Sequence, residues 1–365
     1  MNRSKAIINT KNIRHNLRII REISGTKIIG IVKANGYGTG INEISKVLRD
    51  EGVEMLGVPY VHEAEGLRKE GDTGEILLTG TLSEDEVNNV ISLDLQVCTV
   101  NTNVLNALNN AANLKNTKAL VHIFVDTGMN REGVKPSKLD EFIKVLQTLE
   151  NLKVVGCLTH LIASDDVDKT QTDNQIKEFT VALNKIETAF GKLEYIHTHN
   201  SAAIFNDIVS PSNYSRPGIA IYGFLPTREL QEKSGLIPSL KLMSEVTLIK
   251  QVSKGETVGY SNKYVAEKDI TIALIPFGYG HGFPWALSNC GSFSINNNRC
   301  KIVGSVCMDF TMVDITGLDV SVGDEVIIMG DGITGDSIFD ISEKANTIPY
   351  EIITHLLPRL DREYI

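Results

Sequence analysis

Short apolar segments alternate with amphipathic helical segments from about residue 11 to residue 235, and this alternation constrains the fold more than any other feature. Helical spacing is clear in Ile13, Leu17 and Ile20, which fall on one face of a helix. Strands that alternate with helices form parallel sheets, and eight such units close into a barrel. We therefore predict an α/β fold, a (β/α)8 TIM-like barrel over residues 11–235. The expected strands are Lys27–Val32, Met55–Val58, Ile76–Leu78, Leu95–Val100, Ala119–Val125, Leu152–Cys157, Leu193–Ile196 and a segment near Asn213–Arg216.

From residue 236 the pattern changes to short β-branched segments separated by Gly, Asn and Lys. This pattern predicts a mostly antiparallel C-terminal β domain over residues 236–365, and residues 1–10 are candidates for packing with it. A last helix is expected to begin near Ser342 or Pro349. The expected strands are Val246–Ile249, Ile270–Ile275, Ser292–Ile295, Ile302–Val306 and Val326–Met329.

Charge and cysteine content narrow the class of ligand and the compartment. The net charge of −9 argues against nucleic acid or an anionic membrane as a partner. The five cysteines lack Cys-x-x-Cys spacing, which fits a reducing compartment and predicts neither disulfides nor a metal site. No apolar run is long enough to span a bilayer, and no apolar signal segment follows Met1. We expect a cytoplasmic protein with no nucleic-acid, membrane or metal partner.

Polar clusters follow five of the predicted strands. Barrel enzymes place their chemistry at the carboxyl ends of the strands, so these clusters should meet on one face. They comprise Lys33, residues 126–131, residues 159–160, residues 197–201 and residues 215–219.

Lys33 is the most informative member of these clusters. It follows the apolar run Ile28–Val32 and precedes the glycine-containing turn 34–38. A lysine in a partly desolvated position is suited to forming a Schiff base with a carbonyl cofactor. The alternative is a lysine that reaches water just past the strand, as most lysines do.

The same clusters, with further motifs downstream, resemble the alanine racemase family of fold type III pyridoxal 5′-phosphate (PLP) enzymes. The resemblance covers nearly the whole chain and implies a PLP-binding barrel, a C-terminal β domain, a small amino-acid substrate and a head-to-tail homodimer with shared active sites. The downstream motifs are Val258–Ser261, Phe277–Tyr279, Leu287–Asn289, Val303–Asp309 and Ile348–Glu351.

The resemblance implies two catalytic residues on opposite faces of the substrate. Lys33 matches the lysine that holds PLP and serves one face, and Tyr260 matches a second base that the partner subunit supplies. Behind the tyrosine, His160, Arg216 and His197 match a histidine–arginine chain of the family. Arg216 matches the residue that faces the pyridine nitrogen, where a permanent cation keeps that nitrogen unprotonated.

Binding roles are implied in the same way. The cofactor-binding residues implied, besides Lys33, are Tyr37, His160, Asn200, Ser201, Arg216, Gly218, Ile219 and Tyr350, with the phosphate held partly by the Gly218 and Ile219 amides. The substrate-binding residues implied are Arg131, Met308, Asp309 and Tyr279.

Five positions depart from the family pattern. Phe124 lies where many relatives carry a lysine whose carbamate orients the arginine corresponding to Arg131. Either another anion such as chloride or a neighbouring side chain holds that arginine, or the affinity for substrate is weaker. Thr39 replaces a usual histidine, Gly280-His281 replaces a usual Ala-Asp pair, and Trp285 replaces a common arginine. These departures bear on substrate preference.

The resemblance favours a racemase that interconverts L- and D-alanine, and Tyr350 supports alanine because serine-preferring relatives tend to have a smaller polar residue there. A racemase for serine or a broader set of amino acids is the alternative, because apolar pockets discriminate a single methyl or hydroxyl group by only ~1–3 kcal/mol. A fold type III decarboxylase and a non-catalytic PLP-binding protein are the two rivals from other classes.

Overall fold

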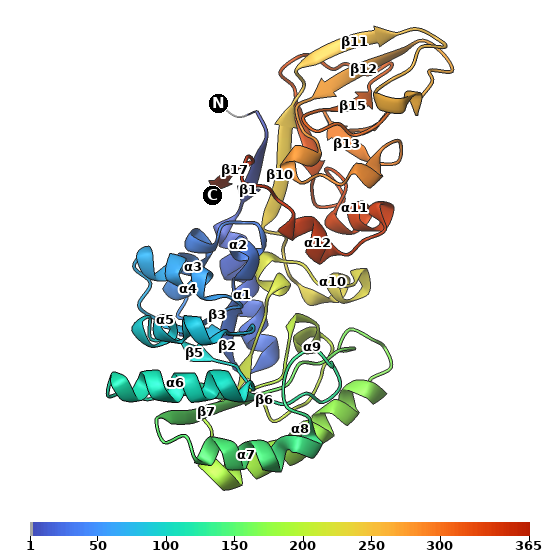
Figure 1. Ribbon diagram of the computed structural model, residues 1–365. Helices are drawn as coiled ribbons and strands as arrows, with labels where there is room; N and C mark the ends of the chain where they lie inside the picture. Colours follow the sequence, from blue (N-terminus) through green and yellow to red (C-terminus); the bar gives the residue numbers. More distant parts are fainter. Residues whose placement is uncertain (1–2) are drawn as a thin grey trace.

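The computed structural model describes residues 3–365 and has two regions, a barrel and a β region, which lie one above the other in Figure 1. The barrel strands pair in parallel in chain order, and the last strand pairs with the first, so the sheet closes. All eight predicted strands are confirmed, with ends that differ by a few residues. They are β2 (Lys27–Ile31), β3 (Met55–Val58), β4 (Glu75–Leu78), β5 (Gln96–Val97), β6 (Ala119–Phe124), β7 (Leu152–Leu158), β8 (Tyr195–His197) and β9 (Tyr214–Ser215).

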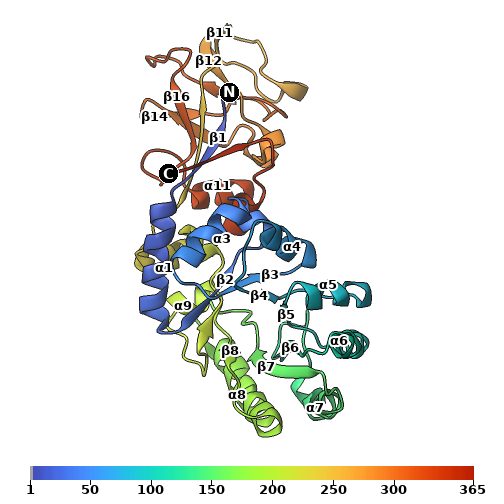
Figure 2. The same ribbon diagram turned by 90° about the vertical axis from the view of Figure 1, so that its left-hand side faces the viewer.

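Helices surround the barrel, as the turned view in Figure 2 shows. The first helix, α1 (Thr10–Ser24), begins where the Asn9 side chain accepts the backbone N–H groups of Lys11 and Asn12. It ends at Gly25, which adopts the left-handed conformation. The other α-helices of this region are α2 (Lys33–Tyr37), α3 (Ile41–Asp50), α4 (Val61–Lys69), α5 (Val87–Ser92), α6 (Thr102–Leu114), α7 (Leu139–Gln147), α8 (Thr170–Phe190), α9 (Ser201–Phe205) and α10 (Arg228–Ser234). Its 3₁₀ helices are η1 (Glu84–Glu86), η2 (Pro136–Lys138) and η3 (Ile219–Tyr222).

The β region holds a six-stranded sheet in the order β14-β13-β16-β10-β1-β17 and a three-stranded sheet in the order β11-β12-β15. The chain's first strand, β1 (Lys5–Ile8), lies between β10 and β17, so both ends of the chain join this sheet. The remaining elements are β10 (Leu240–Glu245), β11 (Leu248–Val252), β12 (Ile270–Ile275), β13 (Ser292–Ile295), β14 (Asn298–Lys301), β15 (Thr311–Asp314), β16 (Glu325–Met329), β17 (Asp361–Tyr364), α11 (Ile338–Ala345) and α12 (Pro349–Thr354).

One strand expected in the β region is absent. Residues 302–306 form no strand: Ile302 makes a single bridge to Val313, and Gly304 then turns the chain with φ of 83°. The last helix, α12, begins at Pro349, which confirms one of the two expected starting positions. The other position, Ser342, lies inside α11, which begins four residues earlier because Ser337 and Asp340 cap it reciprocally.

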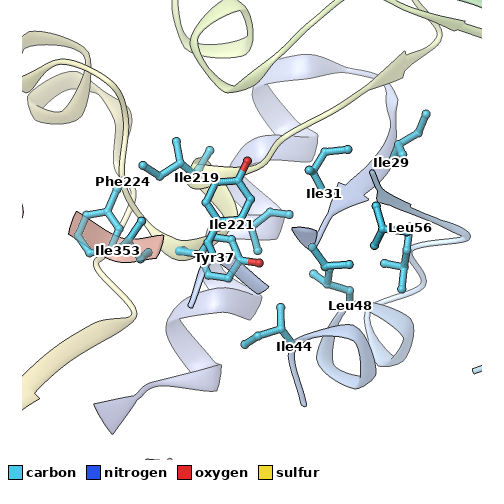
Figure 3. Close-up of a cluster of buried hydrophobic side chains, with 14 of the residues drawn as sticks. Ile29, Ile31, Tyr37, Ile44, Leu48, Leu56, Ile219, Ile221, Phe224 and Ile353 are labelled. Atoms are coloured by element: carbon cyan, nitrogen blue, oxygen red, sulfur yellow. The ribbon is translucent and has the colours of Figure 1, made fainter. Parts of the chain in front are cut away.

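A continuous apolar core joins the barrel to α12, and Figure 3 shows part of it. Ile31 of β2 and Ile44 of α3 lie on the barrel side, while Ile353 of α12 lies on the other side of Tyr37. Ile44 and Ile353 are fully buried, and each buried side chain of this size contributes about 1.5–3 kcal/mol of hydrophobic stabilisation. The turn that follows β2 is therefore held between the two regions.

Candidate active site

A cavity of about 520 Å³ opens at the carboxyl ends of the barrel strands. Nine of the predicted site residues line it: Lys33, Tyr37, Arg131, His160, Asn200, Ser201, Arg216, Gly218 and Tyr350. The expectation that polar residues after separate strands meet on one face is confirmed by this lining.

Lys33 begins an unusual turn directly after β2. Residues 34–38 all have positive φ, from 52° to 80°, so the chain makes a left-handed helical turn. Non-glycine residues adopt this conformation at a cost of roughly 1–2 kcal/mol each, and such strain gathers at functional sites. Two side chains from the C-terminal strand hold the turn: Arg362 Nε donates to the Gly38 carbonyl at 2.8 Å, and the Tyr364 hydroxyl donates to the Thr39 carbonyl at 2.8 Å.

The Lys33 amine faces the cavity in surroundings that disfavour its charge. Burial lowers the pKa of Lys33, and the nearby Arg131 cation lowers it further. Glu63 opposes this effect, but its Oε1 already accepts the Ala34 N–H at 2.8 Å. An amine that loses its proton more readily is a better nucleophile toward a carbonyl carbon.

Arg216 is 6% exposed and is held from several sides. Its Nη2 donates to the Thr159 carbonyl at 2.8 Å and to His160 Nδ1 at 3.3 Å, and its Nη1 donates to His197 Nδ1 at 3.0 Å. Burial lowers the pKa of Arg216 to about 10, so the guanidinium stays charged at neutral pH. Burial and the Arg216 charge lower the pKa of His160 to about 3, so this imidazole is neutral and accepts at Nδ1.

An anion cradle lies at the start of two short helices. Ser201 Oγ accepts the N–H groups of Gly218 at 3.0 Å and of Ala220 at 3.3 Å. Between these two residues Ile219 begins η3, and the first N–H groups of a helix have no partner within it. The Ile219 side chain is fully buried and does not line the cavity.

Tyr37 closes this cradle, because a Cβ on Gly218 would overlap its hydroxyl. Tyr350 lies beside it, with the two ring centroids 6.4 Å apart. Backbone N–H groups, a serine hydroxyl and two phenols are donors suited to a phosphate, and Lys33 is suited to an aldehyde. The residues present therefore fit PLP.

Glu132 is a cavity residue that sequence analysis did not predict. Its Oε2 lies 3.8 Å from Arg131 Nε, and its side chain is 25% exposed. Phe124 also lines the cavity but offers no hydrogen-bonding atom. The signal was present in the sequence as an acidic residue directly after Arg131, combined with an apolar residue at position 124.

Four predicted residues lie outside the cavity, in the β region. Tyr260 is 70% exposed and Met308 is 52% exposed, and Asp309 Oδ1 accepts a hydrogen bond from Arg359 Nη1 at 2.8 Å. Backbone hydrogen bonds join these loops, because Tyr279 N–H donates to the Cys307 carbonyl at 3.0 Å. We call the exposed side chains of Tyr260, Tyr279, Trp285, Met308 and Phe310 the loop face.

Two further observations concern residues 3–365 alone. Within this range no three His, Cys, Asp or Glu side chains gather in a way that could hold a metal ion. None of the helices in the same range combines the length and apolar character that a membrane crossing requires.

Comparison with known proteins gives a consistent result. Residues 8–226 match the family model of the alanine racemase N-terminal domain, and residues 239–364 match that of the C-terminal domain. The chain is 35% identical to alanine racemases of Halothermothrix orenii, covering 98% of this chain and 96% of that one, and of Methanococcus maripaludis, covering 99% and 98%.

Solved structures give the same answer at the level of the fold. The alanine racemase of Clostridium difficile superposes with a TM-score of 0.93 at 32% identity, covering 100% of this chain and 96% of that one. The alanine racemase of Streptomyces lavendulae superposes with a TM-score of 0.95 at 28% identity, covering 100% and 97%.

Proposed function

Because this chain belongs to the alanine racemase family, we propose that it interconverts L- and D-alanine, with PLP bound covalently through the Lys33 amine. The observation that carries the proposal is that Lys33 shares one cavity with the anion cradle and Arg216. In this position, burial and the Arg131 cation both lower the pKa of Lys33. When bound, PLP withdraws electrons from the substrate Cα and so acidifies its proton.

The cavity residues hold the cofactor at both ends. Ser201, the amides of Gly218 and Ile219, Tyr37 and Tyr350 take the phosphate, and Asn200 fixes the start of α9 by accepting the Ala203 N–H at 2.9 Å. Arg216 would hold the ring nitrogen and would keep it unprotonated, because a buried guanidinium donates a hydrogen bond without giving up its proton. The cofactor would then withdraw electrons less strongly, which would favour simple proton exchange over transamination.

Racemisation requires proton transfer on both faces of Cα. Lys33 Nζ removes or returns the proton on one face, and Tyr260 Oη of the partner subunit does so on the other. Tyr260 of the same chain does not line the cavity, and the loop face consists of exposed apolar and aromatic side chains, a type of side chain that is common at interaction sites. These observations support a homodimer whose two active sites are shared.

Arg131 is placed to bind the substrate carboxylate, and Glu132 to hold Arg131. The Met308 amide, Asp309 and Tyr279 of the partner subunit complete this side. Tyr350 limits the room beside Cα, which favours alanine over larger amino acids. We also assign the protein to the cytoplasm, in agreement with its five free cysteines.

Chiral chromatography tests the proposal. The purified protein is incubated with L-alanine, L-serine and L-lysine, with and without added PLP. We expect D-alanine to form fastest and borohydride to fix a pyridoxyl group on Lys33. Faster turnover of serine or lysine would overturn the substrate, and release of carbon dioxide would overturn the reaction class.

A further inference from the structure

We propose that Gln96 and His122 are positioning residues, which join His197 in a one-way hydrogen-bond chain that starts at Arg216 and runs into the barrel interior. The chain fixes the ring nitrogen with which His197 meets Arg216. Its effect on catalysis rests on the proposed function, whereas its existence does not.

The barrel interior contains an unbroken row of polar side chains. His197 Nδ1 accepts from Arg216 at 3.0 Å, His197 Nε2 lies 2.9 Å from His122 Nδ1, and His122 Nε2 lies 2.7 Å from Gln96 Oε1. Both histidines are fully buried and Gln96 is 4% exposed. A buried polar group that lacks a partner costs about 1–3 kcal/mol, so this row must be internally satisfied.

The donor chemistry of Arg216 sets the direction of the row. A guanidinium only donates, so His197 must accept at Nδ1 and carry its proton on Nε2. His122 then accepts at Nδ1 and donates from Nε2 to the Gln96 carbonyl oxygen. Burial and the Arg216 charge lower the pKa of both histidines, that of His122 to about 3, so each ring has a single proton to place.

Beyond the row, Tyr195 packs against His122, with the two ring centroids 5.2 Å apart, and its hydroxyl donates to Glu75 Oε1 at 2.9 Å. Glu75 is the first residue of β4, whereas the cavity is lined by residues that follow this strand. The row therefore lies between the cavity and the opposite end of the barrel.

The neighbouring strand leaves room for the His122 side chain inside the barrel. A Cβ at Gly156, on the neighbouring strand β7, would overlap the His122 imidazole. The pairing of β6 with β7 also shifts register between Val121 and His122. The Arg216 cation at the start of the row polarises each of its hydrogen bonds in the same sense, which strengthens the row as a unit.

Two substitutions at Gln96 separate this role from simple packing. Gln96→Leu removes the acceptor of the His122 Nε2 proton, so His122 gains by moving that proton to Nδ1, which competes with the Arg216–His197 hydrogen bond. Gln96→Glu keeps an oxygen facing His122 and is the conservative control. Tyr214→Phe is the packing control, because Tyr214 lies against Tyr195, with ring centroids 5.1 Å apart, and outside the row.

The readout is solid-state 15N NMR of histidine-labelled holoenzyme, which identifies the protonated nitrogen of each ring without turnover. We expect single neutral Nε2–H forms of His122 and His197 in the unmodified protein, in Gln96→Glu and in Tyr214→Phe. Gln96→Leu should show a second form of His122, with kcat about 3- to 10-fold lower and KM for alanine changed less than about 2-fold.

An Nδ1–H or doubly protonated His122 in the unmodified protein would overturn the inference, even if Gln96→Leu failed to fold. The inference would also be overturned if Gln96→Leu kept the tautomers and the kcat of the unmodified protein. It would equally be overturned if kcat fell as far in Gln96→Glu as in Gln96→Leu. Absence of racemisation alongside the expected tautomers would instead overturn the proposed function alone.

Discussion

The barrel cavity and the loop face carry complementary parts of the predicted chemistry, but their side chains differ in burial and in the number of partners they have within the chain. In the cavity Arg216 is 6% exposed and donates to partners on three sides. On the loop face Tyr260 is 70% exposed. The buried, hydrogen-bonded side chains of the cavity can bind a ligand without help from another chain. Exposed aromatic side chains, in contrast, are typical of surfaces that bind another protein. We infer that the barrel forms its half of the site alone and that the loop face completes the site of a second copy.

Lys33→Ala disrupts the barrel half alone and should give the largest effect. It removes both the covalent attachment of PLP and one of the two bases, so we expect kcat for alanine to fall at least about 10⁴-fold. Chiral chromatography measures the loss, and Lys46→Ala is the control because Lys46 is an exposed lysine paired with Glu43. Activity within about 10-fold of the unmodified protein would remove Lys33 from the mechanism.

Tyr260→Phe disrupts the loop-face half alone and should have the second largest effect. Loss of one general acid–base residue lowers kcat about 10²- to 10³-fold, in both directions because each turnover needs both faces of Cα. The phenyl ring is retained, so circular dichroism should be unchanged. Unaltered rates in both directions would refute the two-base assignment.

Mixing the two inactive variants tests whether the halves come from different copies. A dimer of one Lys33→Ala chain and one Tyr260→Phe chain would contain one intact site and one doubly altered site. After random subunit exchange of equal amounts, about one quarter of the unmodified activity should return. No recovery, with exchange verified by mass spectrometry, would show that each site uses a single chain.

The two regions also differ in how far their sequence predicts their structure. Seven of the barrel strands lie in mostly apolar segments, because a parallel sheet is buried on both faces, and they were predicted from those segments. The eighth, β9, is Tyr214–Ser215, which is no apolar run, and it was expected only as a strand near Asn213–Arg216. The strand β17 was not predicted, because Asp361–Tyr364 is polar and forms the edge of its sheet by pairing with β1 only. Its pairing depends on a segment more than 350 residues away, which no local pattern reveals.

The site shows a similar division. Seven of the nine predicted residues that line the cavity belong to the clusters that follow predicted strands, whereas Tyr37 and Tyr350 were implied by the family resemblance. Gln96 and His122 were not predicted because they lie within strands, where the alternation of apolar residues says nothing about a polar side chain facing the barrel interior. Only the closed barrel brings them into line with Arg216.

Acid should lower the free energy of unfolding, because the barrel contains buried histidines that are neutral in the folded protein. The pKa of His122 and of His160 is about 3 in the folded protein, below the ordinary value of about 6.5. The unfolded chain therefore binds more protons, and stability is lost as the pH falls from about 6.5 toward 3. At pH 5 the loss is roughly 2 kcal/mol for each of these histidines. The urea midpoint should be lower at pH 5 than at pH 7, and His122→Gln should reduce the difference, whereas His355→Gln in the β region should leave it unchanged.

Glu132→Gln should have the smallest effect and tests whether the barrel half is self-sufficient in orienting Arg131. The carboxylate of Glu132 lies 3.8 Å from Arg131 Nε, and an ion pair with a half-exposed arginine contributes about 0.5–1 kcal/mol, so KM for alanine should rise about 2- to 5-fold. The inhibition constant of propionate, a carboxylate without an amino group, should rise equally. Glu141→Gln is the control, because Glu141 is exposed and paired with Lys138. If both constants match the unmodified protein, the anion that orients Arg131 lies outside the barrel half, and Asp309 of the partner subunit becomes the carboxylate to test.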